Sequence, residues 1–191
     1  VMCSNDDSEY YKVHYKYDSS NDSWTQLNDL PVDFFNGLAV VYNNEIHVMA
    51  GESKKNHYKY DSSNDSWTQL NDLPYNYPEV AIVYDNEIHI FGGSNDNRNK
   101  HYKYNLDDDS WMQLTDFSYY LYDIKAVVYN NEIHIFKGDT STVHYKYDGT
   151  NITQVEDNSF DLSYGIVTVY NNEMYLIGGY DNYKNRFYKY N

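Results

Sequence analysis

The sequence predicts an all-β repeat protein, and three observations support that class. A segment that reads as two strands and a turn, AIVYDNEIHIFGG at 81–93, recurs at 39–51, 126–138 and 167–179. The motif HYKYD or a variant begins at His14, His57, His101 and His144 and returns as FYKYN at Phe187, which gives offsets of 43, 44, 43 and 43 residues. So steady a period is typical of repeat folds. The 25 tyrosines and only three prolines favour sheet with polar turns.

Each repeat contains four segments of strand length, as at 125–129, 132–136, 144–147 and 152–155. The first segment is almost wholly apolar or aromatic, which indicates the innermost strand, covered on both faces. Two Asn or Asp residues separate it from the second segment. Because these residues tolerate positive φ, we expect a tight two-residue hairpin there. The second segment ends in Gly-Gly or a reduced form of it, where a missing side chain lets another backbone approach.

The third segment alternates polar and aromatic residues, as in HYKY at 57–60, and its charged lysine places it nearer the rim. The fourth begins at Trp24, Trp67 and Trp111, with Ile152 in that place in the last full repeat. Four short strands in each repeat, with the innermost strand apolar, match one blade of a β-propeller.

We therefore expect a single propeller of four-stranded antiparallel blades. Three complete blades are predicted at 31–73, 74–116 and 117–157, with partial blades at 1–30 and 158–191. Closure as four blades would leave the segment 14–17 redundant. The chain is therefore expected to be an excerpt of a longer propeller, or one whose further blades come from elsewhere in the molecule or from another chain.

The repeat resembles the kelch repeat in four features, which are Gly92-Gly93, Tyr104, Trp111 at a fixed distance, and Leu-Pro soon after the tryptophan in some copies. The resemblance extends over essentially the whole chain and implies a kelch-type propeller. Kelch repeats usually begin their first strand with arginine, whereas this chain has Asn36-Gly37, Glu79, Asp123 and Gly165, with only Lys125 close. The basic ring that some family members use for acidic peptides is therefore absent.

Composition excludes several classes of function. Lys and Arg number 14 against 29 Asp and Glu, a formal charge of −15, which disfavours nucleic acid and anionic lipid as partners because both need clustered basic side chains. The apolar runs are far shorter than the roughly 20 residues that cross a bilayer, so we expect no transmembrane segment. We also expect no signal peptide in this stretch, and the localisation stays open. Cys3 is the single cysteine, so no disulfide can form within one chain.

The histidines form two columns, with His47, His89 and His134 in the second segment and His14, His57, His101 and His144 in the third. Metal ligands lie about 2.0–2.1 Å from an ion, whereas equivalent positions in successive blades lie roughly 10 Å apart. Tyr175 and Phe187 replace both columns in the last copy, so we interpret them as packing positions. The acidic loops 18–22, 61–65 and 107–109 lack the pattern of an EF-hand and should close turns. No metal or cofactor is predicted.

No nucleophile elbow or phosphate loop is present, so no catalytic residue is predicted. The segment before each first strand varies while its neighbours repeat, and it should lie at the same end of the blades as the loop between the second and third strands. Aromatic rings beside polar side chains there are typical of a recognition surface. The predicted ligand-binding residues are Phe34, Phe35, Tyr75, Tyr77, Tyr119, Tyr120, Tyr122, Phe160, Tyr164, Asn97, Arg98 and Asp181.

The favoured function is a non-catalytic module that binds a protein or a glycan through this aromatic face. In the alternative interpretation of the rings, they plug the mouth of the channel and pack between blades. Two other functions stay open. The Tyr- and Asn-rich repeats also resemble, more loosely, those of bacterial or phage tail-associated proteins, which serve as structural or receptor-binding parts. A kelch-like sugar-modifying enzyme would need a non-repeating polar cluster with a perturbed titrating group.

Overall fold

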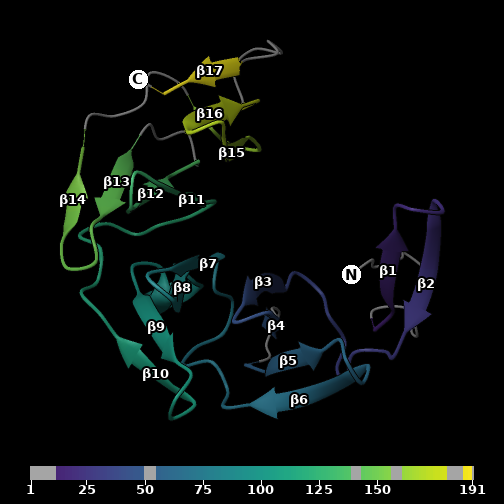
Figure 1. The fold of residues 1–191 in the computed structure, drawn as a ribbon. Coiled ribbons are helices and arrows are strands. Elements are labelled where there is room, and N and C mark those ends of the chain that lie inside the picture. Colours follow the sequence, from purple (N-terminus) through teal and green to yellow (C-terminus); the bar gives the residue numbers. More distant parts are fainter. Residues whose placement is uncertain (1–11, 50–54, 139–142, 156–160, 180–186, 191) are drawn as a thin grey trace. The chain divides into compact units, whose positions relative to one another are not determined.

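The computed structural model describes residues 12–49, 55–138, 143–155, 161–179 and 187–190, and these form an all-β fold with one short 3-10 helix (Figure 1). The chain divides into two compact units, residues 1–77 and 78–191. No helix in the described ranges has the length and apolar character needed to span a membrane.

The first unit contains a two-stranded and a four-stranded antiparallel sheet. The strands of the smaller sheet are β1 (His14–Asp18) and β2 (Ser23–Leu27). The larger sheet has the order β3 (Leu38–Tyr42), β4 (Glu45–Met49), β5 (His57–Asp61) and β6 (Ser66–Leu70). Consecutive strands are therefore neighbours throughout, as expected for blades built from successive hairpins.

The second unit contains three further antiparallel sheets of the same kind. The first is β7 (Val80–Tyr84), β8 (Glu87–Phe91), β9 (His101–Asn105) and β10 (Ser110–Gln113), with η1 (Asn95–Asn97) between β8 and β9. The second is β11 (Lys125–Tyr129), β12 (Glu132–Phe136), β13 (His144–Tyr147) and β14 (Ile152–Gln154). The third is β15 (Ile166–Tyr170), β16 (Glu173–Ile177) and β17 (Phe187–Lys189).

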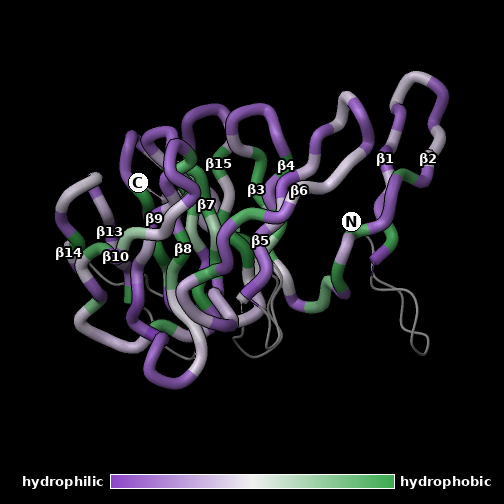
Figure 2. The backbone as a smooth tube through the Cα atoms, turned by 90° about the horizontal axis from the view of Figure 1, so that it is seen from below, coloured by the Kyte–Doolittle hydropathy of each residue, from purple (hydrophilic) through white to green (hydrophobic). Residues whose placement is uncertain are grey.

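The hairpins between first and second strands have the predicted backbone. Both residues of each turn lie at positive φ, with values of 47° and 58° at Asp85 and Asn86 and 49° and 60° at Asn130 and Asn131. This conformation matches the twist of the two flanking strands. It sets the register in which Tyr84 pairs with Glu87 and Val80 with Phe91. The turns are hydrophilic and the strands they join largely hydrophobic (Figure 2).

The first strands are innermost in the second unit, where β11 contacts both β7 and β15 (Figure 1). The expectation that they are covered on both faces was wrong, because residues of β7 are mostly half-buried and those of β15 alternate between exposed and half-buried. The second strands are the most buried, and Ile88, Ile90 and Phe91 of β8 have no exposed surface. A second strand has a neighbour on each edge within its sheet, whereas each first strand forms one edge.

Adjacent sheets of the second unit share an aromatic core. The Tyr84 hydroxyl donates to the carbonyl of Asn131 at 3.0 Å, which links two hairpin turns. Phe117 is buried and packs against Tyr145 of the next sheet with ring centroids 5.3 Å apart. The close backbone approach predicted at the glycines is found at Gly179, where a Cβ atom would lie 2.3 Å from the carbonyl oxygen of Asp161. Only glycine fits there.

Candidate functional site

Two chain segments of the second unit are fastened together at one end of their sheet, as predicted from strand alternation. The loop 92–100 joins β8 to β9, and the segment 114–124 joins β10 to β11. The amide of Leu121 donates to the carbonyl of Arg98 at 2.8 Å, and the amide of Phe117 donates to that of Asn99 at 2.9 Å. The side-chain amide of Asn99 donates a second hydrogen bond, of 3.2 Å, to the backbone carbonyl of Phe117. These bonds hold the loop against the segment.

Three tyrosines of this segment point into solvent because the residues around them are anchored. Phe117 and Leu121 are buried, whereas Tyr119, Tyr120 and Tyr122 keep 61, 59 and 53% of their surface exposed. Tyr119 and Tyr120 line a pocket of about 390 Å³ together with Asn99 and Ser118. We call these four residues, together with Tyr122 and Arg98, the tyrosine surface.

Arg98 completes the tyrosine surface. Its guanidinium carbon lies 5.8 Å from the centre of the Tyr122 ring, within the range of a cation–π contact. No carboxylate oxygen of the described residues lies within 4.0 Å of it, whereas Lys100 pairs with Asp116 at 2.6 Å. The planar group is therefore held by an aromatic ring with its hydrogen-bond donors open to a ligand.

A polar cluster that differs from the other repeats lies where the first strands begin. Glu79 precedes β7, Asp123 precedes β11, and the ammonium of Lys125 donates to both the carbonyl and the carboxylate of Asp123. Burial and the Asp123 carboxylate raise the pKa of Glu79, opposed by a hydrogen bond from the Asp123 amide and by Lys125 and Arg98. Sequence reasoning noted these positions as departures from the kelch pattern but did not assign them to a site.

The predicted aromatic residues of the first unit occupy different environments. Phe34 and Tyr75 keep 7 and 4% of their surface, so these rings are anchors rather than exposed groups. Phe35 is 43% exposed, and Tyr77 is half-buried with φ at 60°. In each case the residue two places after the anchor has positive φ, as Asn36 does. Such geometry turns the chain into the following first strand.

The remaining predicted residues belong to the second unit. Asn97 is half-buried at the end of η1, directly before Arg98. Tyr164 is 88% exposed, and its amide lies 3.4 Å from the carboxylate of Asp123, which places its backbone beside the polar cluster. Phe160 and Asp181 lie outside the described residues. The structure thus gathers Tyr119, Tyr120, Tyr122, Asn97 and Arg98 at one place.

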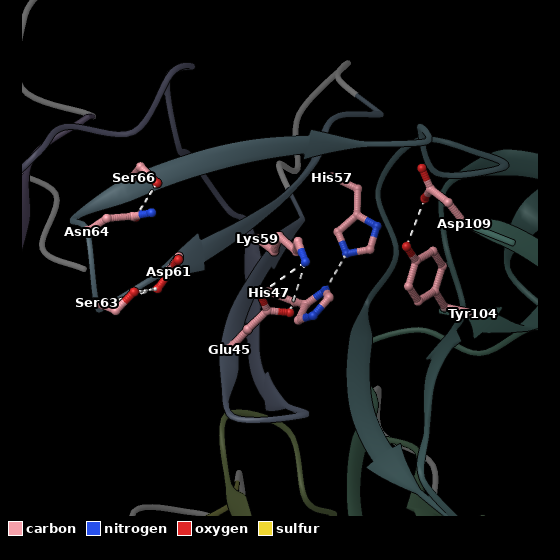
Figure 3. A network of polar contacts seen from close by, with 10 residues as sticks. All are labelled: Glu45, His47, His57, Lys59, Asp61, Ser63, Asn64, Ser66, Tyr104 and Asp109. Carbon is pink, nitrogen blue, oxygen red and sulfur yellow. Dashed lines mark hydrogen bonds and ion pairs between the residues drawn. The ribbon is translucent and has the colours of Figure 1, made fainter. Parts of the chain in front are cut away.

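The two histidine columns meet inside each complete sheet, a contact that the sequence did not reveal. The buried pairs have Nδ1 to Nε2 distances of 2.9 Å for His47 and His57 (Figure 3), 2.9 Å for His89 and His101, and 3.0 Å for His134 and His144. Such a bond needs one ring nitrogen to donate and the other to accept, so at least one ring of each pair is neutral. Burial, the largest cause, lowers the pKa of His101 to about 2 and that of His144 to about 3.

Charged residues near these pairs also repeat. The Lys59 ammonium lies 3.0 Å from the Glu45 carboxylate (Figure 3), and Lys103 lies 2.8 Å from Glu87 in the same register. The acidic loops close turns with their own side chains, as predicted. The Asp61 carboxylate, for example, accepts a bond of 2.8 Å from the amide of Ser63.

Comparison with known proteins supports the fold alone. No protein-family model matches the chain, and no curated protein matches it. Among solved structures, one titled "Structure of YjhT" superposes with a TM-score of 0.73 at 15% sequence identity, covering 94% of this chain and 75% of that chain. The successive antiparallel sheets of the chain and this structural likeness together show a propeller-type fold.

Proposed function

We propose that this chain is a kelch-type propeller module that binds carbohydrate through the tyrosine surface. One observation carries the proposal: two exposed tyrosine rings, Tyr119 and Tyr120, line a pocket whose other lining residues are an asparagine and a serine. Exposed aromatic rings at one spot, fixed by buried anchors and backbone hydrogen bonds, are typical of recognition surfaces. The repeat pattern supports the kelch assignment.

The chemistry of the lining favours a sugar. A pyranose presents C–H groups on its faces and hydroxyls around its edge, so it can stack on a tyrosine ring while amide and hydroxyl groups bind its rim. The volume of about 390 Å³ lies in the range of small-ligand pockets. A neutral glycan also avoids repulsion by the formal charge of −15, which an acidic partner would meet.

The test is a glycan array followed by calorimetry with the best glycan. The double variant Tyr119→Ala/Tyr120→Ala removes two rings from the lining. Each aromatic contact is worth about 0.5–1.5 kcal/mol, so the double variant should weaken binding on the order of 5- to 150-fold. Met112→Ala is the matched control, because Met112 is a large side chain of the same unit, 49% exposed and outside the tyrosine surface.

Two outcomes would overturn the proposal. One is a glycan whose affinity is equal for wild type and for the double variant. The other is an array without binding alongside a protein partner, found by cross-linking and mass spectrometry, whose capture needs Tyr119 and Tyr120. Circular dichroism of each variant shows that the fold is retained, since both rings are mostly exposed.

The polar cluster favours a second candidate, a sugar-modifying activity at the same end of the sheet. Glu79 is a half-buried carboxyl with a raised pKa, and a general acid or base near neutral pH is made in this way. NMR spectra of a bound glycan over time would detect turnover. An active wild type with an inactive Glu79→Gln variant that still binds supports the activity, and an unchanged glycan rejects it.

A further inference from the structure

The sheet β1–β2 contains an aromatic pair that is preformed and about half exposed. Tyr17 and Trp24 have ring centroids 5.0 Å apart at 46°. Their counterparts in the next sheet, Tyr60 and Trp67, have nearly the same geometry, 4.9 Å at 46°. Tyr60 keeps only 3% of its surface, whereas Tyr17 and Trp24 keep 45 and 55%. We call Tyr17 and Trp24 the aromatic plug.

The junctions inside each unit show what such a plug contacts. The His14 ring meets Tyr60 edge to face at 4.6 Å and 86°, and meets Trp67 at 5.3 Å. In the second unit Tyr147 meets His101 at 4.8 Å and 90°. The Tyr190 ring likewise meets His144 at 5.4 Å and 87°. The last tyrosine of a third segment therefore packs on the first residue of the third strand in the preceding sheet, at each junction that the structure describes within a unit.

The sheet β15–β17 has exposed aromatic rings at the positions that such a plug contacts. Phe187 occupies the place of His101 and His144 and is 65% exposed, whereas both histidines are fully buried. Tyr175 stacks on it with centroids 5.2 Å apart. Tyr170, which corresponds to the buried Tyr84, is 67% exposed. We call Tyr170, Tyr175 and Phe187 the aromatic socket.

We propose that the aromatic socket of one copy of this chain binds the aromatic plug of a second copy. The plug and the socket are aromatic rings in the registers that meet at the internal junctions, where Tyr147 contacts Tyr84, His89 and His101. Tyr175 and Phe187 stand in the places of the two histidines, so the socket is complementary to the plug, and neither is complementary to itself. Such a contact is heterologous, and it forms closed rings or open filaments of copies rather than a two-fold dimer. The tyrosine surface is not part of it.

Charge sets the conditions for this association. Each copy has a formal charge of −15, so copies repel one another at low ionic strength. The Debye length falls from about 10 Å at 0.1 M salt to about 3 Å at 1 M, which screens the repulsion but leaves contacts between apolar rings. Association should therefore strengthen as salt is added, the opposite of a contact held by ion pairs.

The experiment is sedimentation velocity of the full chain over a range of protein and salt concentrations, with two kinds of variant. Trp24→Asp removes the plug, and Phe187→Asp removes the socket. Each variant alone should stay monomeric. An equimolar mixture should form a heterodimer that cannot grow, because one plug and one socket survive between the two chains.

A wild type that is monomeric at every concentration and salt overturns the proposal, as does a mixture that stays monomeric while both variants keep their circular dichroism. Association of either variant alone also rejects it. If Phe187→Asp unfolds, Tyr170→Asp replaces it as the socket variant, because this exposed residue lies on another strand. If Trp24→Asp unfolds, Tyr17→Asp takes its place by the same criterion.

Discussion

Replacement of one buried histidine pair should make the second unit less sensitive to acid. His89 and His101 are at most 1% exposed, and their rings hydrogen-bond to each other. Both rings are neutral at pH 7, because burial lowers the pKa of each. Lys103 and Glu87 lie near the pair, and the Tyr147 ring closes over His101. The last sheet has tyrosine and phenylalanine in the two places. The double variant His89→Tyr/His101→Phe therefore copies a pair that the chain already uses.

The size of the effect follows from the pKa values. Burial lowers the pKa of His89 to about 4 and that of His101 to about 2. An unfolded histidine titrates near 6.5, so the unfolded chain binds more protons than the folded one below that pH, and folding stability falls as the pH falls from 6.5 toward these values. At pH 5 the loss is about 2 kcal/mol for each ring, or about 4 kcal/mol for the pair, against total stabilities of about 5–15 kcal/mol.

Urea denaturation at pH 7 and pH 5, followed by circular dichroism, measures this loss. The drop in unfolding free energy between the two pH values should be smaller in the double variant by about 4 kcal/mol. Asp18→Asn is the control, because hydrogen bonds from Ser20 lower the pKa of Asp18 and its effect belongs to a more acidic range. Equal drops in wild type and double variant would refute the assignment of a neutral buried pair.

Three further changes test the packing. Asp65→Ala removes the carboxylate that accepts the amide of Asn28 at 3.0 Å, so the first unit should lose about 1–3 kcal/mol in urea denaturation. Gly179→Ala places a Cβ atom 2.3 Å from the carbonyl oxygen of Asp161 at a φ of 103°. The second unit should lose about 1 kcal/mol or more of stability, and its melting temperature should fall. Glu79→Gln removes a carboxyl whose raised pKa makes its ionised form unfavourable in the folded state; its urea midpoint at pH 7 should equal or exceed that of wild type, and a lower midpoint would contradict the burial.

The sequence was sufficient for the elements whose signals are local. Pairs of Asn and Asp predicted the hairpin turns, and the strands Lys125–Tyr129 and Glu132–Phe136 have the predicted bounds. The fourth strands β6 and β10 begin one residue before their tryptophan, because Asp61 and Ser66 and their counterparts pair across the hairpin. A repeat period also places loops at the same end of the blades, and the hydrogen bond from the Leu121 amide to the Arg98 carbonyl confirms this.

Features that depend on side-chain depth were not predictable in the same way. Tyr75 and Tyr120 are both tyrosines of the variable segment, but the first is 4% exposed and the second 59%. Leu121 is the buried residue in the segment that contains Tyr120, and the neighbouring tyrosine rings are exposed to solvent. The buried residue lies five places before the following first strand at Tyr75 and four places before it at Leu121, so the distance to the strand does not identify it.

The histidine pairs show that the repetition of a residue does not by itself indicate a functional role. Each column alone has one imidazole per sheet, but antiparallel pairing brings the two columns of a sheet within 3.0 Å of each other, because His89 and His101 both lie on buried faces of adjacent strands. The last copy keeps the packing with Tyr175 and Phe187, which cannot form that bond, so the position requires a flat ring and not an imidazole. Arg98 has the opposite character: no other repeat has an arginine three residues before its third strand, and the Arg98 side chain is exposed and lies against an exposed ring. Residues of that second kind are where ligand recognition in this chain should be sought.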